Sequence, residues 1–198
     1  MLDSTRPIGK TLNTDTGRPK STSAGVLSSW YALRATYSRE LKVQAHLQEK
    51  GIRTFVPMMW RRTETNGKQV KKLVPAISSL VFVYWTREGI DSYIRSFGDA
   101  RPVNYYWDRT TTAPLTVPAK AMENFITIAS TLDEDLVFLT EVSEKLREGQ
   151  TVKVKEGPFK GVEGKIVRIR KSRRVLVELP GMLAVASTYV APEELEII

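Results

Sequence analysis

Apolar residues recur along the chain with periods that change from one segment to the next, and each period predicts an element. The aromatics of residues 30–35 favour a strand. After Ser38, a candidate N-cap, apolar residues accompany good helix formers as far as Gly51, which predicts a helix. The continuous apolar run at residues 80–85 predicts a buried strand, and residues 88–97 carry apolar side chains on one face of a short helix.

A polar hairpin is predicted between the first helix and the buried strand. Residues 54–60 favour a strand, and Pro57 within them favours an edge position because proline cannot donate to a ladder. The basic stretch 61–72 has Asn66-Gly67 at its middle, a pair that strongly favours a hairpin tip. Further along, apolar residues at helical spacing predict a helix over 118–132.

The pattern changes again near residue 146, where short alternating strands are separated by glycines, prolines or charge pairs. The strand candidates are residues 151–155, 161–170, 175–179, 182–188 and 194–198. Five short strands in about fifty residues predict a small all-β barrel.

These patterns predict an α+β protein of two domains. Residues 1–27 lack hydrophobic periodicity and are predicted to form a disordered basic tail. Residues 28–132 form the first domain, residues 133–145 an acidic connector, and residues 146–198 the barrel.

Composition narrows the classes of function. Thirty lysines and arginines against 22 acidic residues give a net charge of +8, which favours a polyanionic partner. Without cysteine there are no thiolate ligands, and the single histidine, His46, cannot build a multi-histidine metal site. The acidic run 133–135 has no histidine or nucleophile beside it, so we predict no catalytic residue, no metal and no cofactor.

The same composition predicts a location in the cytoplasm. The absence of cysteine fits a reducing compartment. The first 29 residues contain no apolar run long enough for a signal peptide, and no run approaches the ~20 residues that cross a bilayer, so no membrane partner is expected.

The most specific motif lies over residues 147–167. A Gly149-Gln150 turn enters an alternating strand, residues 156–159 read Glu-Gly-Pro-Phe and turn the chain, and Gly161 and Gly164 permit a positive φ or a close backbone approach. This pattern resembles a KOW motif, which occurs in NusG-type elongation factors and in some ribosomal proteins.

The N-terminal half resembles the N-terminal domain of the NusG family. The resemblance rests on Trp30-Tyr31-Ala32-Leu33 before a helix, the basic hairpin, Leu80-Val81-Phe82-Val83 and the helix after Glu88. It implies a non-enzymatic, monomeric elongation factor with a NusG-like α/β sandwich domain that binds RNA polymerase. It also implies a mobile five-stranded KOW barrel that recruits a second partner, such as a ribosomal protein or Rho.

One departure from the family pattern points to a specialised relative. Housekeeping NusG proteins usually have Phe-Pro-Gly-Tyr-Val before the central strand, whereas this chain has Ile77-Ser78-Ser79-Leu80-Val81. In this it resembles the UpxY and RfaH group, antiterminators of long operons such as those for capsular polysaccharide. A housekeeping factor that couples transcription to termination or translation, and a ribosome- or RNA-binding KOW protein, remain alternatives.

Two sets of candidate site residues follow for the first domain. Polymerase is expected to dock on an apolar concavity, although ordinary core packing would use the same residues: Tyr37, Val56, Pro57, Ile77 and Leu80. Non-template DNA or nascent RNA is expected to meet one face of the first helix and the hairpin, although solvated charge would look the same: Arg39, Lys42, His46, Arg61, Arg62, Lys68, Lys71 and Lys72.

The barrel has a candidate partner surface of its own. It comprises Phe159, Lys160, Arg168 and Arg170. Phe159 is either an exposed anchor or a residue that closes the end of the barrel. A wider basic cluster includes Lys165, Lys171, Arg173 and Arg174, and it indicates either RNA contact or a solvated hairpin.

Overall fold

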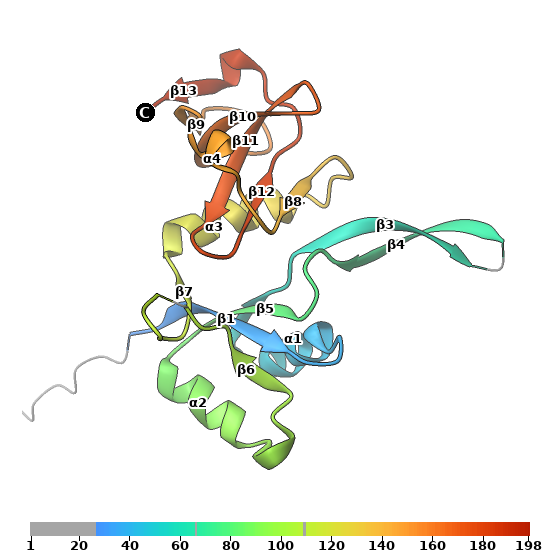
Figure 1. The fold of residues 1–198 in the computed structure, drawn as a ribbon, viewed down its shortest axis with the longest axis vertical. Helices are drawn as coiled ribbons and strands as arrows, with labels where there is room; N and C mark the ends of the chain where they lie inside the picture. Colours follow the sequence, from blue (N-terminus) through green and yellow to red (C-terminus); the bar gives the residue numbers. More distant parts are fainter. Residues whose placement is uncertain (1–26, 66, 109) are drawn as a thin grey trace, which may run out of the picture.

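The first domain is built on an antiparallel sheet. The computed structural model describes residues 27–198 apart from 66 and 109, with the side chains of 145 and 147 also left out, so the predicted disorder of the tail falls almost wholly outside the described residues. The sheet has the order β2-β5-β1-β6, with β7 also paired to β1 (Figure 1). Its strands are β1 (Ser29–Ala35), β2 (Arg53–Phe55), β5 (Leu80–Trp85), β6 (Val103–Tyr105) and β7 (Thr116–Val117).

Alternation along the central strands gives the sheet two apolar faces. Tyr31, Leu33, Val81 and Val83 point to the face covered by α1 (Glu40–Glu49) and α2 (Arg87–Arg95). The intervening residues Trp30, Ala32, Leu80 and Phe82 point to the opposite face, which is covered by α3 (Ala119–Ala129). The strand predicted over 80–85 is confirmed. The helices predicted over 88–97 and 118–132 are also confirmed, with the observed bounds Arg87–Arg95 and Ala119–Ala129.

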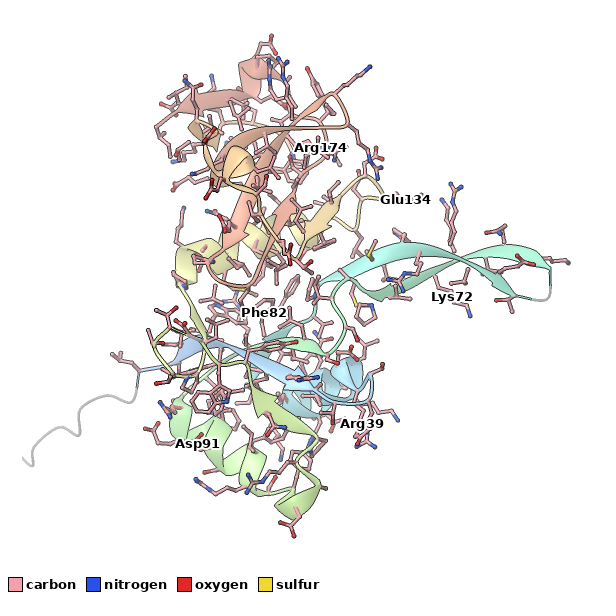
Figure 2. The ribbon with its side chains drawn as sticks, viewed as in Figure 1. Arg39, Lys72, Phe82, Asp91, Glu134 and Arg174 are labelled. Atoms are coloured by element: carbon pink, nitrogen blue, oxygen red, sulfur yellow. The ribbon has the colours of Figure 1, made fainter. Side chains whose placement is uncertain are left out.

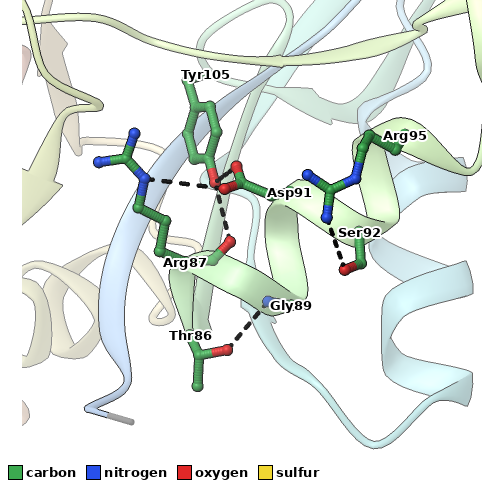
Figure 3. A network of polar contacts seen from close by, with 7 residues as sticks. All are labelled: Thr86, Arg87, Gly89, Asp91, Ser92, Arg95 and Tyr105. Carbon is green, nitrogen blue, oxygen red and sulfur yellow. Dashed lines mark hydrogen bonds and ion pairs between the residues drawn. The ribbon is translucent and has the colours of Figure 1, made fainter.

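A polar network holds α2 to the sheet (Figure 3). The Thr86 hydroxyl accepts a hydrogen bond from the Gly89 amide at 3.1 Å and caps the helix, while the Tyr105 hydroxyl donates to the Asp91 carboxylate at 2.8 Å. Burial, followed by the Asp91 hydrogen bond, raises the pKa of Tyr105. The phenol therefore stays protonated and acts as a donor. A short 3₁₀ helix (Gly98–Ala100) then leads into β6.

The predicted hairpin is present as a long two-stranded ribbon that projects from the domain (Figure 1). Its strands are β3 (Met58–Thr65) and β4 (Lys68–Pro75), and Thr65 pairs with Lys68 across a two-residue connection in which Gly67 has φ +72°. The single strand predicted over 54–60 is divided between β2 and β3. Val56 and Pro57 lie in the break, because proline cannot donate to the ladder.

The C-terminal domain is a strongly curved sheet in the order β13-β9-β10-β11-β12-β8. All five predicted strands are present, and their observed bounds are Thr151–Val154 (β9), Glu163–Ile169 (β10), Ser172–Leu179 (β11), Leu183–Ala186 (β12) and Leu195–Ile197 (β13). The sixth strand, β8 (Val137–Leu139), comes from the segment predicted as a connector and pairs with β12. Two short helices, α4 (Glu144–Arg147) and a 3₁₀ turn (Pro192–Glu194), complete the domain.

Helix α3 lies between the two domains and contacts both. Phe125 packs against Phe82 of the sheet at a ring distance of 5.9 Å and against Phe138 of β8 at 6.3 Å. The Asn124 amide donates to the Glu163 carbonyl of β10 at 3.1 Å, and Lys120 pairs with the Glu163 carboxylate at 3.3 Å. The barrel is therefore docked on α3 by one continuous apolar core and two polar contacts. Within the described part of the chain, no helix combines the length and apolar character that a membrane crossing needs.

Candidate functional site

The predicted cationic face of α1 is exposed as the helical spacing requires. Arg39, Lys42 and His46 lie three and four residues apart and all reach solvent. His46 is also tied to α2, since its Nδ1 lies 3.1 Å from the Tyr93 hydroxyl. The predicted cap was wrong: the N-cap position is Arg39, not Ser38, because Ser38 is in a left-handed turn with φ +52°.

Tyr37 stands beside this face and not in a concavity. Its side chain is 83% exposed, and its backbone is left-handed with φ +58°. The Arg39 guanidinium lies 5.5 Å from the centre of the Tyr37 ring. An exposed ring beside a guanidinium group is a suitable surface for an unstacked base and its phosphate.

The five hairpin cations are all exposed, but they divide between two faces. Arg62 and Lys71 are cross-strand partners, and Lys71 pairs with Glu134 at 2.5 Å in the segment after α3. Figure 2 labels Glu134 and, on the hairpin, Lys72, which follows Lys71 in the chain. The Lys71 hydrogen bond is the main reason why the pKa of Glu134 is lowered. Arg61, Lys68 and Lys72 share the other face, and none of the ion pairs among the described residues involves them. This second face is the one open to an anionic partner.

The predicted docking residues do not form one concavity. Tyr37 is exposed at a turn, Val56 lies in the core beneath α1 and α2, and Leu80 lies in the core beneath α3. Val56 and Leu80 therefore belong to the two apolar cores on opposite faces of the sheet. Pro57 is buried beside Val56, and Ile77 is half-buried against the core on the α3 side.

Ile77 and Leu80 instead line a groove between the domains. It has a volume of about 690 Å³, and its apolar lining is shared between the first domain and the turn that joins β11 to β12. The first domain contributes Ile77, Leu80, Tyr106, Trp107 and Leu115; the barrel contributes Pro180, Gly181, Met182 and Leu183. Trp107 is 56% exposed at this groove, although its ring also contacts Tyr105.

The predicted barrel residues also separate. Phe159 is 3% exposed and packs in the barrel core, so it closes the barrel and the reading as an exposed anchor was wrong. Lys160 is exposed near the β9–β10 turn. Arg168 and Arg170 are exposed at the β10–β11 turn, where they line a separate hollow with Tyr189.

Two exposed aromatic residues that line these hollows, Trp107 and Tyr189, were not predicted from the sequence. The adjacent aromatics at 105–107 were a signal, since consecutive strand residues alternate between buried and exposed sides. Tyr189 had no such signal because its exposure depends on a loop after β12. Among the described residues there is no group of three side chains suited to holding a metal ion.

Comparison with known proteins matches both halves of the chain. Residues 28–126, half of the chain, match the family model described as "Transcription termination factor nusG". Residues 148–178 match the model of the KOW motif. No curated protein matches the chain.

One similar solved structure is described as "Domain interaction in Thermotoga maritima NusG". It is 19% identical in sequence, with a TM-score of 0.44, and the match covers 86% of this chain and 97% of that chain. The two family-model matches fall on the two domains described above, one on each.

Proposed function

Because the chain belongs to the NusG family of transcription factors, we propose that it binds transcribing RNA polymerase through its N-terminal domain and regulates elongation without catalysing a reaction. The observation that carries this proposal is the match of residues 28–126 to the family model. That same domain presents an apolar groove and two cationic surfaces. A domain that combines an apolar anchor site with cationic surfaces suits a protein partner that itself holds nucleic acid.

The groove is the proposed docking site for polymerase. Its exposed Trp107 is the kind of aromatic anchor that dominates protein interfaces, and Ile77 lies beside it. Leu80 packs beneath the floor of the groove, but its side chain is only 1% exposed and cannot itself contact a partner. A charged residue at Leu80 would disrupt the core, so Trp107 is the better position at which to test docking.

The proposed nucleic-acid surface combines the α1 face with the free face of the hairpin. Arg39 and His46 can stack on or hydrogen-bond to an exposed base of non-template DNA or nascent RNA, since guanidinium and imidazole groups are planar. Arg61, Lys68 and Lys72 supply charge to phosphates. The barrel would recruit a second protein, with a ribosomal protein or Rho as candidates and Lys160 as an exposed contact.

The finer proposal is a cytoplasmic antiterminator of the UpxY and RfaH type, acting on long operons such as those for capsular polysaccharide. The loop 77–81 supports it, because this loop departs from the housekeeping sequence and adjoins both the docking groove and α1. The Glu40 carboxylate, buried at the start of α1, accepts a hydrogen bond from the Ser79 amide and joins the two surfaces.

Transcription through a terminator, on matched templates with and without a candidate leader, tests this proposal. Read-through should rise with the protein and depend on the leader. An Arg39→Ala, His46→Ala double variant should lose the leader preference while still binding polymerase. Increased termination would favour the housekeeping alternative, and an unchanged leader preference in the double variant would remove the α1 face from the recognition site.

A further inference from the structure

A hollow of about 470 Å³ lies at the tip of the β10–β11 hairpin in the barrel. It is lined by Arg168, Arg170, Lys171, Ser172, Arg173 and Tyr189. None of these residues lines the groove between the domains, so the hollow is separate from the proposed polymerase site. Four of its six lining residues are cations and none is acidic.

The positive charges of these four residues are not neutralised by any acidic side chain that the structure describes. Arg168 and Arg173 are direct cross-strand partners, and like charges in that position destabilise a sheet. In the part of the chain that the structure describes, no ion pair involves Arg168, Arg170, Lys171 or Arg173. The arrangement therefore costs stability in the free protein, and an anion bound in the hollow would relieve the repulsion.

The turn itself carries a second cost. Ile169 pairs with Ser172, so Arg170 and Lys171 form a two-residue hairpin loop, with φ values of +50° and +65°. Left-handed conformations at both positions define a turn that favours Asn-Gly, because other side chains strain the backbone there. Two long cations at strained positions are typical of a functional turn.

The loop that carries the aromatic side of the hollow is hydrogen-bonded to the rest of the barrel. Tyr189 is 60% exposed, yet its loop is tied to β11 by the Val190 amide, which donates to the Arg173 carbonyl at 3.3 Å. The buried Arg174 guanidinium donates to the Ser187 carbonyl at 2.8 Å, and the Ser187 amide donates to the Val175 carbonyl at 2.9 Å. The backbone on both sides of Tyr189 is thus ordered before binding, which reduces the entropy that binding would cost.

We propose that this hollow binds single-stranded RNA, with phosphates on the four cations and one base stacked on Tyr189. The face of a base is available to an aromatic ring only when the strand is unpaired, which favours a single strand over a duplex. An acidic peptide would use the cations but would leave the ring without a role. The choice of RNA over single-stranded DNA rests on the proposed function, since the transcript is the single strand that leaves polymerase.

Fluorescence anisotropy of the full-length protein with a labelled, unstructured RNA of about ten nucleotides tests the proposal. Tyr189→Ala should lower the affinity roughly tenfold through lost stacking. An Arg170→Asn, Lys171→Gly variant should lower the affinity and reduce its salt dependence, yet raise the melting temperature because it installs the favoured turn pair. Its weaker binding could therefore not be ascribed to unfolding.

The matched control is Lys153→Ala, Lys155→Ala, which removes two exposed cations at β9 of the same barrel. This control should lower the RNA affinity less than the turn variant does. Unchanged RNA affinity in Tyr189→Ala or in the turn variant would overturn the proposal. The proposal would also be overturned if duplex RNA, single-stranded DNA of the same sequence or a polyglutamate peptide bound as tightly as the single-stranded RNA, or more tightly. Because the assay contains no polymerase, its failure is distinct from a failure to bind polymerase.

Discussion

Ser79 has a left-handed backbone, with φ +65°, at the position where the housekeeping family sequence has glycine. A side chain in this conformation costs free energy that glycine would not. The loop is held by the buried Glu40 carboxylate, which accepts from the Ser79 amide. This residue shows how a departure visible in the sequence can have a physical consequence that only the backbone conformation reveals.

Replacing Ser79 with glycine should therefore raise the free energy of unfolding, by about 1 kcal/mol. Ser78→Gly is the control, because Ser78 is an exposed loop residue without a positive φ, and the added freedom of the unfolded chain should lower stability slightly. Urea denaturation measures both. Equal shifts of the same sign in the two variants would show that the Ser79 conformation stores no strain.

Residue spacing predicted the exposed face of α1 but could not predict which apolar residues would be accessible. Val56 and Leu80 were grouped because both are apolar and near the first helix in the predicted order, yet they lie on opposite faces of the sheet. Which face a residue occupies depends on strand pairing, and pairing is a contact between distant segments. The burial of Phe159 likewise depends on closure of the barrel.

The elements were predictable because their signals are local. Asn66-Gly67, the apolar run of β5 and the alternation in the barrel each lie within a few residues of the element they specify. β8 lies in the segment predicted as a connector, and its pairing with β12 was not predicted, since nothing in a three-residue strand indicates which strand it will pair with. The division of the hairpin cations into two faces follows from the register of β3 and β4.

That division predicts different effects for two adjacent lysines in the hairpin. Lys72→Ala should weaken retention on elongation complexes and flatten its salt dependence by about one counterion, because Lys72 lies on the free face. Lys71→Ala should have less effect, since Lys71 is already paired with Glu134. Retention measured across a salt series separates the two. A larger loss for Lys71 would place the nucleic acid on the other face.

In the whole molecule, the barrel limits access to the groove proposed as the docking site for polymerase. The turn at residues 180–182 forms one wall of the groove, and the barrel is held there by α3. A partner that binds the first-domain side of the groove must therefore compete with this turn for the same apolar residues. This arrangement could not be predicted from the sequence, because the sequence pattern of each domain does not indicate which of its surfaces meets the other domain.

Loosening the barrel should consequently strengthen polymerase binding. Asn124→Asp places a carboxylate against the Glu163 carbonyl and should weaken the contact by about 1–3 kcal/mol. Faster amide hydrogen exchange in α3 and tighter retention on polymerase are expected. Glu123→Gln, an exposed change on the same helix, should alter neither. Faster exchange with weaker retention would mean that the docked barrel assists binding.

Docking of polymerase at the groove is tested most directly by retention on purified elongation complexes, with Trp107→Ala compared against Tyr84→Ala. Both side chains are partly exposed aromatics of the first domain, but only Trp107 lines the groove. We expect the wild-type protein and Tyr84→Ala to be retained by polymerase and not by ribosomes, and Trp107→Ala to lose roughly tenfold or more in affinity for polymerase. Failure of the wild-type protein to bind polymerase, or its retention by ribosomes instead, would show that this protein does not act on transcribing polymerase.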